Sequence, residues 1–340
     1  MKSKTALITG VSGQDGAYLS KHLLEKGYRV IGGDRRAASN TFWRLKKLNI
    51  FDQIEIVNLD ICEFSNIFEV INKFKPDEIY NLAAQSFVGS SFDLPIVTSD
   101  STATGTTRIL ESIKKIHPVC KFYQASSSEM FGKVHQTPQN EDTKFYPRSP
   151  YAVSKVYAHM MTINYREAYK MFCCCGILFN HESPLRGDNF VTKKIVSSLV
   201  RVSKNTQNYL DIGNLDAKRD WGYAKDYVEA MHLMLQHKKP EDFVIATGKS
   251  YSVRYFIEKV CELLDIKIEW KGKDKEEVGI NKKNKKIIVK VNPKFYRPSE
   301  VDFLLGDYSK AKKILSWEPK HDLDQLIEIM VNSEINDLKE

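Results

Sequence analysis

The stretch TALITGVSGQDGAYLSKHLL, which runs from Thr5 to Leu24, decides the fold. It begins with a short apolar run typical of a strand, continues with three glycines in the spacing GxxGxxG, and ends in an amphipathic helical pattern. Gly10 permits a tight turn, Gly13 lets the backbone approach a pyrophosphate, and Gly16 allows close packing of helix on strand. The amino end of the helix offers N–H groups and partial positive charge to phosphates. The stretch therefore predicts a dinucleotide site.

Apolar runs alternate with helical patterns through the first 180 residues. The strand-like runs are TALIT, YRVIGG, IEIVN, DEIYNLA, KFYQAS and MFCCCGILF. This alternation is typical of a parallel sheet with helices on both faces. We predict an α/β fold with a Rossmann-type, doubly wound parallel sheet in residues 1–180. Residues 181–340 show two short β-type runs and a helical end, and we expect them to form a smaller substrate-binding part, with the chain crossing between the two.

Composition limits the classes of partner. The chain has 340 residues, is 42% hydrophobic and carries a formal net charge of +8, so it can bury a sizeable core. The charge fits either a lysine-rich solvated surface or an anionic ligand such as a nucleotide. The lysine-rich segment 271–286 lacks the interleaved aromatic residues that stacking on bases needs. We therefore expect no nucleic-acid partner.

Cysteine usage and hydropathy indicate the compartment. The six cysteines form no CxxC pair, and three of them are consecutive, which fits buried free thiols in a reducing environment. No apolar run approaches about 18 residues, and the amino end lacks a signal-peptide pattern. We expect a cytoplasmic protein without a membrane span or a metal site.

The end of the second strand-like run, VIGGDRR, bears on the choice of cofactor. An acid at this place holds the 2′-hydroxyl of NAD, whereas an arginine accommodates the 2′-phosphate of NADP. The sequence has both, in Asp34, Arg35 and Arg36. Two adjacent guanidiniums favour NADP, and Asp34 leaves NAD open.

Two further segments supply groups for chemistry. ASSSEMFG (residues 125–132) brings three serines and Glu129 to the end of a buried strand. YAVSK places Tyr151 and Lys155 on one face of a helix. The ammonium is expected to lower the phenol pKa from about 10. The phenolate then removes a hydroxyl proton while hydride leaves the same carbon.

The chain resembles the extended short-chain dehydrogenase/reductase superfamily and, within it, the GDP-mannose 4,6-dehydratases. The resemblance spans nearly the whole sequence. FYPRSPYAVSK and GILFNHESPLRG are its most specific segments, and YNLAAQSFVGSSF, NLDAKRDWGYAKDYVEAM and FYRPSEVD also carry it. Such enzymes remove water from a GDP-sugar.

Site residues follow from this resemblance together with the motifs. The expected catalytic residues are Ser127, Glu129, Tyr151 and Lys155. The expected cofactor residues are Gly10, Gly13, Gln14, Asp15, Gly16, Arg35, Arg36, Asp60, Ile61, Leu82, Ala83, Ala84, Gln85, Ser86, Tyr151, Lys155, His181 and Arg186. The expected substrate residues are Ser86, Ser127, Glu129, Asn180, Lys193, Arg219, Arg297 and Glu300.

The resemblance also implies a mechanism. Hydride leaves C4 of the sugar, the resulting ketone acidifies the C5 proton, Glu129 removes that proton, the C6 hydroxyl leaves as water, and hydride returns to C6. A GDP-sugar 4-reductase or epimerase, the closest alternative, has no need of Glu129. A non-catalytic redox sensor would be expected to lose Ser127, Tyr151 or Lys155. Serine at position 127 departs from the threonine usual in these enzymes, and loses the methyl group that restricts its rotamer.

Two properties stay open at the level of sequence. The sugar is GDP-mannose or a related GDP-manno-sugar such as a GDP-manno-heptose. The basic segment 35–48, with Phe42 and Trp43, is long for a connection after the second strand and resembles a loop that reaches a neighbouring subunit. We therefore expect a homo-oligomer, in the form of a tetramer.

Overall fold

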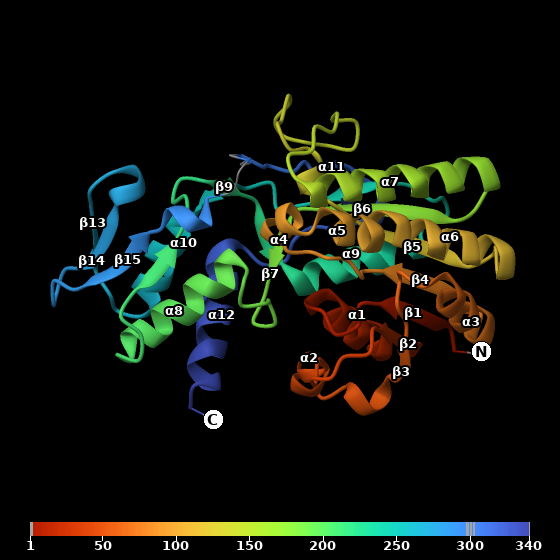
Figure 1. The fold of residues 1–340 in the computed structure, drawn as a ribbon, viewed down its shortest axis with the longest axis horizontal. Coiled ribbons are helices and arrows are strands. Elements are labelled where there is room, and N and C mark those ends of the chain that lie inside the picture. Colours follow the sequence, from red (N-terminus) through yellow and green to blue (C-terminus); the bar gives the residue numbers. More distant parts are fainter. Residues whose placement is uncertain (1–2, 297–298, 300, 302, 340) are drawn as a thin grey trace.

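The computed structural model describes residues 3–296, 299, 301 and 303–339. It has a large part built on a parallel sheet and a smaller part beside it, which lies to the left in Figure 1 and contains the last helix of the chain. Among the described residues, no helix is both long and apolar enough to cross a bilayer.

The central sheet has seven parallel strands in the order β11-β6-β5-β4-β1-β2-β3. The strands are β1 (Thr5–Thr9), β2 (Arg29–Asp34), β3 (Glu55–Asn58), β4 (Glu78–Asn81), β5 (Lys121–Ser127), β6 (Cys173–Leu178) and β11 (Phe243–Ile245). The chain builds outward from β1 to β3 and then returns to place β4 on the other side of β1. This reversal creates a crevice at the carboxyl ends of the strands, where such sheets bind ligands. The predicted Rossmann-type fold is confirmed.

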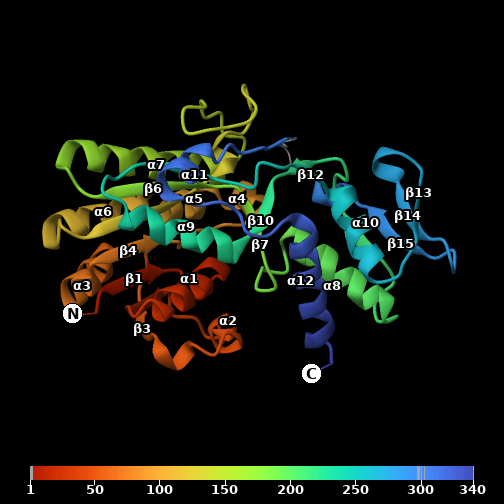
Figure 2. The ribbon, with the colours of Figure 1, turned by 180° about the vertical axis from the view of Figure 1, so that it is seen from behind.

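Helices cover both faces of this sheet (Figures 1 and 2). One core cluster joins the sheet to α1 (Gln14–Glu25), α9 (Ala224–Gln236) and α11 (Ser309–Leu315). Another joins it to α3 (Phe64–Phe74), α6 (Gly105–Ile116) and α7 (Pro150–Tyr169). Three short helices lie in connections: α2 (Trp43–Lys47), α4 (Val88–Asp93) and α5 (Pro95–Ser99). Periodic apolar residues explain the helices; in α3, for example, Ile67, Val70 and Ile71 are buried.

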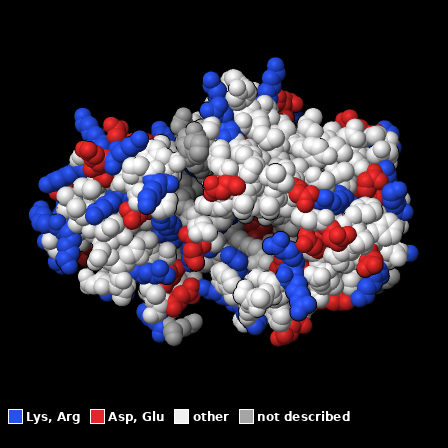
Figure 3. All heavy atoms as spheres, viewed as in Figure 1, with Lys and Arg blue, Asp and Glu red and all other residues white. Residues whose placement is uncertain are grey.

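The smaller part packs helices on a four-stranded sheet of order β13-β14-β15-β8. The strands are β8 (Leu210–Ile212), β13 (Ile268–Lys271), β14 (Val278–Asn281) and β15 (Ile287–Val291), and the helices are α8 (Val191–Ser203), α10 (Val253–Leu263) and α12 (Leu323–Asp337). The lysine-rich residues 282–286 form the exposed turn between β14 and β15. Lysine and arginine side chains are abundant at this end of the molecule (Figure 3).

Two short ladders join the parts. β7 (Asn180–Glu182) pairs with β10 (Trp221–Tyr223), and β9 (Lys218–Arg219) pairs with β12 (Tyr251–Ser252). The expectation of only two β-type runs after residue 180 is therefore wrong. The strands from β7 to β15 are two to five residues long. They are defined by pairing with partners remote in the chain rather than by a local sequence pattern. Because β11, α9 and α11 return to the large part, a cut at residue 180 does not separate the two.

The cysteines are free thiols, as expected, and five of the six are buried. Cys173 and Cys174 point to opposite faces of the sheet, since they belong to different core clusters. Burial raises the pKa of the Cys174 thiol to about 12. The three consecutive cysteines therefore serve as buried packing residues, and their thiols are protonated.

One partly buried ion pair fixes α7 to the sheet and generates a stability prediction. Arg166 donates to both carboxylate oxygens of Asp242, from Nη1 at 2.8 Å and Nη2 at 2.6 Å, and Asp242 also accepts the Cys175 N–H at 2.9 Å. Arg166→Ala leaves a largely shielded carboxylate uncompensated and is expected to lower the free energy of unfolding by about 3 kcal/mol, the lower end of the range for buried pairs.

Arg29→Ala is the matched control, because its ion pair with Glu55 is exposed and is worth less than about 1 kcal/mol. Urea unfolding of both variants measures the difference. Equal losses for the two variants would contradict the role given to Arg166.

Candidate active site

A cavity of about 660 Å³ lies at the carboxyl end of the parallel sheet, between the two parts. Its volume is in the range of small-molecule and cofactor sites. The loops after β4, β5 and β6 and the start of α7 form one side. The other side comes from α8, β9 and the segments 212–217 and 294–296 of the smaller part. Figure 3 shows the surface hollowed between the two parts.

The end of β5 explains why the strand delivers several polar groups to one point. Ser127 is the last residue of β5, and its hydroxyl accepts the N–H of Glu129 at 3.2 Å. This bond caps a 3-10 turn, Ser128–Met130, which brings Glu129 back to the edge where Ser127 lies. Both residues line the cavity.

Helix α7 brings Tyr151 and Lys155 to the same edge. The Ser149 hydroxyl caps the helix by accepting the Ala152 N–H at 3.1 Å, and Pro150 occupies the first turn. Lys155 Nζ donates to the Ala125 carbonyl at 2.6 Å and lies 5.7 Å from the centre of the Tyr151 ring. The expected helical pairing of phenol and ammonium is therefore present beside β5.

The pKa values of this pair differ from the sequence expectation. Burial raises the pKa of Tyr151 to about 12, while a hydrogen bond with Ser127 acts in the opposite direction and the charge of Glu129 adds to the rise. Burial also lowers the pKa of Lys155 to about 8. The expectation that Lys155 lowers the phenol pKa is thus wrong, because burial is the largest influence on that pKa and the groups that oppose it are Ser127 and Arg186.

The glycine turn is shaped for close approach. Gly10 has a φ of +71°, and a Cβ there would lie 3.0 Å from the backbone of Ala83. A Cβ on Gly16 would lie 2.4 Å from the Gly10 carbonyl. The turn therefore admits only glycine at both positions, and it leaves the amino end of α1 open to an anionic group. At the end of β2, Asp34 Oδ2 is shielded from solvent and has no hydrogen-bond partner in the described residues. These features fit a nicotinamide dinucleotide.

A charged network joins the glycine turn to β7. Asp15 Oδ2 lies 2.7 Å from His181 Nε2, and His181 Nδ1 lies 2.7 Å from the Phe179 carbonyl. Gln14 donates to Asp15 at 3.0 Å and to the His181 carbonyl at 3.1 Å. Although burial acts to lower it, the charge and hydrogen bond of Asp15 raise the pKa of His181. Both ring nitrogens face acceptors, so the network favours the imidazolium.

Twelve of the expected residues line this cavity, and ten more lie at the same end of the sheet. Those that line it are Asp15, Leu82, Ala84, Ser86, Ser127, Glu129, Tyr151, Lys155, Asn180, His181, Arg186 and Arg219. Those at the same end of the sheet but outside the lining are Gly10, Gly13, Gln14, Gly16, Arg35, Arg36, Asp60, Ile61, Ala83 and Gln85. Arg297 and Glu300 lie outside the described residues.

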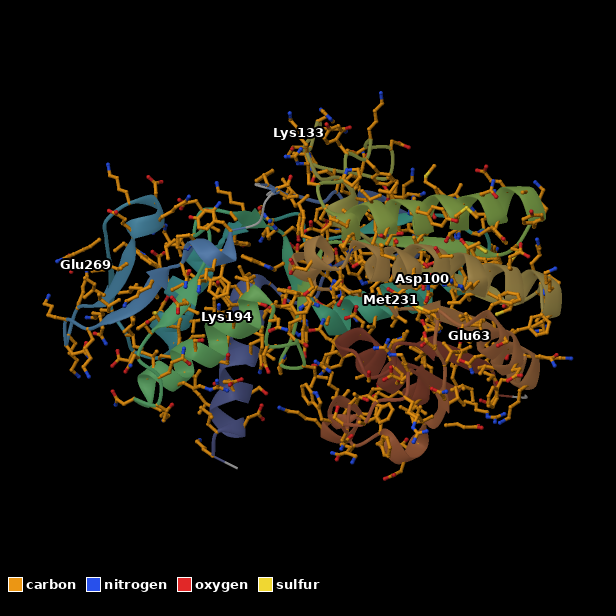
Figure 4. The ribbon with its side chains drawn as sticks, in the orientation of Figure 1. Glu63, Asp100, Lys133, Lys194, Met231 and Glu269 are labelled. Atoms are coloured by element: carbon orange, nitrogen blue, oxygen red, sulfur yellow. The ribbon has the colours of Figure 1, made fainter. Side chains whose placement is uncertain are left out.

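Lys193 is directed away from the cavity. Its Nζ lies 2.6 Å from Glu334 Oε2 on α12, and both side chains are buried. Lys194 lines the cavity instead, stacked on the Phe295 ring, and is labelled on α8 in Figure 4. Consecutive helical residues point about 100° apart. The sequence alone therefore does not show which of Lys193 and Lys194 faces a ligand.

Other cavity residues were not anticipated from the sequence. Trp221 lines the cavity, and its indole nitrogen is buried without a hydrogen-bond partner in the described residues. Phe190 packs edge-on against Phe87 at 6.0 Å and lies under the Arg186 guanidinium at 3.6 Å. Trp221 lies two residues after Arg219 in the KRDW segment, so its place in the site could have been predicted from that motif. Phe87 and Phe190 come from segments far apart in the chain, and no sequence pattern indicates that they meet.

Comparisons with known proteins agree with this geometry. Residues 7–330 match the family model described as GDP-mannose 4,6 dehydratase. The GDP-mannose 4,6 dehydratase of Drosophila melanogaster is 49% identical, over 98% of this chain and 87% of its own length. That of Homo sapiens is 50% identical, over 97% and 91%. The crystal structure of dTDP-glucose 4,6-dehydratase from Bacillus anthracis superposes with a TM-score of 0.82 at 20% identity, covering 99% of this chain and 98% of that one, which shows the same fold.

The shifted pKa of Lys155 generates a pH prediction. Because burial disfavours the charged amine, the neutral form should appear as the pH rises through about 8. Competitive labelling with acetic anhydride, read by mass spectrometry across pH 6–11, should give a midpoint for Lys155 near that value.

Lys114, whose pKa is raised by its hydrogen bond to Glu111, is the internal control and should label only at higher pH. A Lys155 midpoint close to that of an ordinary lysine, about 10.4, would contradict the environment described.

Proposed function

The chain belongs to the GDP-mannose 4,6-dehydratase family, and we propose that it removes water from a GDP-linked manno-sugar to give the GDP-4-keto-6-deoxy sugar. The enzyme class is hydro-lyase. The observation that carries the proposal is the position of Glu129, which lines one cavity together with Ser127, Tyr151 and Lys155. An acid/base carboxylate beside the tyrosine is what elimination needs beyond oxidation at C4.

We assign the proton transfers to these residues. As the phenolate, the form that the interaction with Ser127 favours, Tyr151 takes the proton of the C4 hydroxyl. When bound, the nicotinamide supplies a reversible acceptor for the hydride that leaves C4 and is returned at C6. The C4 ketone acidifies the C5 proton, and Glu129 removes it. The protonated Glu129 then donates to the C6 hydroxyl, which leaves as water. Once the hydride is back at C6, Tyr151 would return its proton at C5, so the sugar undergoes no net oxidation.

The cofactor proposal rests on the glycine turn and the residues after β2. The open amino end of α1 would hold the pyrophosphate. Arg35 and Arg36 are exposed after β2 and would bind a 2′-phosphate, so we propose NADP(H), with NAD(H) kept open by Asp34. Lys155 would hold the nicotinamide ribose, and His181 and Arg186 would lie at the same site.

The substrate proposal uses residues from both parts of the molecule. Asn180, Arg219 and Lys194 line the cavity and would bind the diphosphate, with Lys194 in place of Lys193. Ser86 would face the sugar. Arg297 and Glu300 remain proposed contacts of the nucleotide. The sugar is mannose or a manno-heptose.

We place the enzyme in the cytoplasm, since its thiols are free. A GDP-sugar 4-reductase or epimerase is disfavoured by Glu129.

Replacing Glu129 tests the dehydratase chemistry. Glu129→Gln keeps the size of the side chain but cannot accept the C5 proton, and loss of a positioned acid/base typically costs about 10²–10⁴ in rate. Single-turnover absorbance in the nicotinamide band should show reduced cofactor accumulating, without 4-keto-6-deoxy product by mass spectrometry.

Tyr151→Phe is the companion variant, and it should show neither signal because the first proton has no acceptor. Cofactor binding should persist in both proteins. Product formation by Glu129→Gln at the parental rate would remove Glu129 from the mechanism.

We also propose a homo-oligomer, with a tetramer as the expected form. Trp43, in the segment 35–48, is 40% exposed, whereas Phe42 packs on Phe51. Helices α5 and α7 contact each other, and both expose apolar side chains: Ile96 and Val97, and Val153, Tyr157 and Met160. An exposed apolar surface of this kind fits a second copy of the chain.

Light scattering should give four times the 39.1 kDa chain mass. Val153→Glu with Met160→Glu should lower that mass, because charge is costly in an apolar interface. Val119→Glu, at an exposed valine before β5, should leave it unchanged. A wild-type monomer would contradict the proposal.

A further inference from the structure

One oxygen of the Asp34 carboxylate accepts a hydrogen bond, and the other has no partner among the described residues. Asp34 is the last residue of β2, and its backbone carbonyl accepts the Leu59 N–H at 2.9 Å. Its Oδ1 accepts the Arg35 N–H at 2.9 Å, which fixes the orientation of the side chain. Its Oδ2 is shielded from solvent and has no hydrogen-bond partner in the described residues. A buried acceptor in this state costs free energy until a donor reaches it.

This oxygen lies where a dinucleotide places its adenosine ribose. The carbonyl of Gly33, the preceding residue, accepts the Gly10 N–H at 2.9 Å, so the end of β2 is tied to the glycine turn. In folds of this type the ribose lies beside the residue at the end of the second strand. An ionised carboxylate only accepts hydrogen bonds. The 2′- and 3′-hydroxyls of NAD(H) can both donate to it.

NADP(H) presents different chemistry at the same place. Its 2′-oxygen is esterified, so one donor is lost, and the phosphate brings negative charge next to the carboxylate. Arg35 and Arg36 oppose that repulsion. Both are exposed, and no hydrogen bond or ion pair within the described ranges reaches either guanidinium. The backbone N–H of Arg36 donates to Asn58 Oδ1 at 3.1 Å. The backbone that carries the two arginine side chains is therefore fixed.

We propose that Asp34 makes this a dual-cofactor site, which binds NAD(H) as well as NADP(H), and that Asp34 sets the ratio of the two affinities. The acceptor oxygen recognises the free ribose hydroxyls, and the arginines recognise the 2′-phosphate. The inference rests on the proposed function only in requiring a nicotinamide dinucleotide at the glycine turn.

The test compares binding of NADH and NADPH to cofactor-free protein, followed by energy transfer from tryptophan to the reduced nicotinamide. The wild type should bind the two within about tenfold of each other. Asp34→Asn keeps the shape of the side chain but replaces the acceptor Oδ2 with an NH₂ donor. A phosphate oxygen can accept from that donor, whereas the ribose hydroxyl loses the acceptor to which it donates. It should weaken NADH by about tenfold and tighten NADPH by several-fold, in line with the selectivity of hydrogen-bonded sites. A general loss of structure would weaken both.

Two further variants sharpen the result. Arg36→Ala should weaken NADPH alone. Glu55→Gln is the control, because it removes a carboxylate from β3 opposite Ile31 rather than opposite Asp34. That position is three residues, or about 10 Å, along the strand from Asp34. The variant should change neither affinity by more than about twofold.

The outcomes separate this inference from the cofactor proposal beneath it. A wild type that prefers NADPH by more than about 100-fold, with a ratio unchanged in Asp34→Asn, would overturn the role of Asp34 and leave the proposed enzyme intact. Failure of both dinucleotides to bind would overturn the cofactor proposal itself.

Discussion

The attachment of α7 to the end of β5 is the constraint on which the site depends. Three consecutive strand residues are held by three helix residues spaced four apart. The Ala125 carbonyl accepts from Lys155 at 2.6 Å, Ser126 Oγ lies 2.9 Å from His159 Nδ1, and Ser127 lines the cavity together with Tyr151, whose pKa it acts to lower. Residues four apart share a helix face. One rigid contact therefore sets the distance between hydroxyl, phenol and ammonium, and the Arg166–Asp242 pair holds the same helix farther along.

A second constraint fixes the smaller part over this edge. Asp220 is buried between the cavity-lining residues Arg219 and Trp221, and its carboxylate accepts the N–H groups of Thr247 at 2.8 Å and Gly248 at 3.0 Å. Burial raises its pKa to about 6, against the effect of these hydrogen bonds. Because Thr247 and Gly248 follow β11 of the central sheet, Asp220 ties the wall of the cavity directly to the sheet that carries the catalytic groups.

The sequence allowed prediction of what local patterns determine. The glycine turn, the alternating strands and helices, and the pairing of Tyr151 with Lys155 follow from spacing alone. The short strands of the smaller part did not, because their partners are remote in the chain. The choice between Lys193 and Lys194 depends on the rotation of α8 against α12. The rise in the Tyr151 pKa depends on burial, which tertiary packing produces and no motif encodes.

Intramolecular hydride return, with loss of water, is the central claim, and isotope labelling tests it most directly. GDP-mannose carrying deuterium at C4 should be incubated with the protein and its cofactor, and the product examined by mass spectrometry and NMR. The account predicts a product lighter by one water, with the deuterium retained at C6. A product of unchanged mass, as from an epimerase, or a dehydrated product without deuterium at C6, would contradict it.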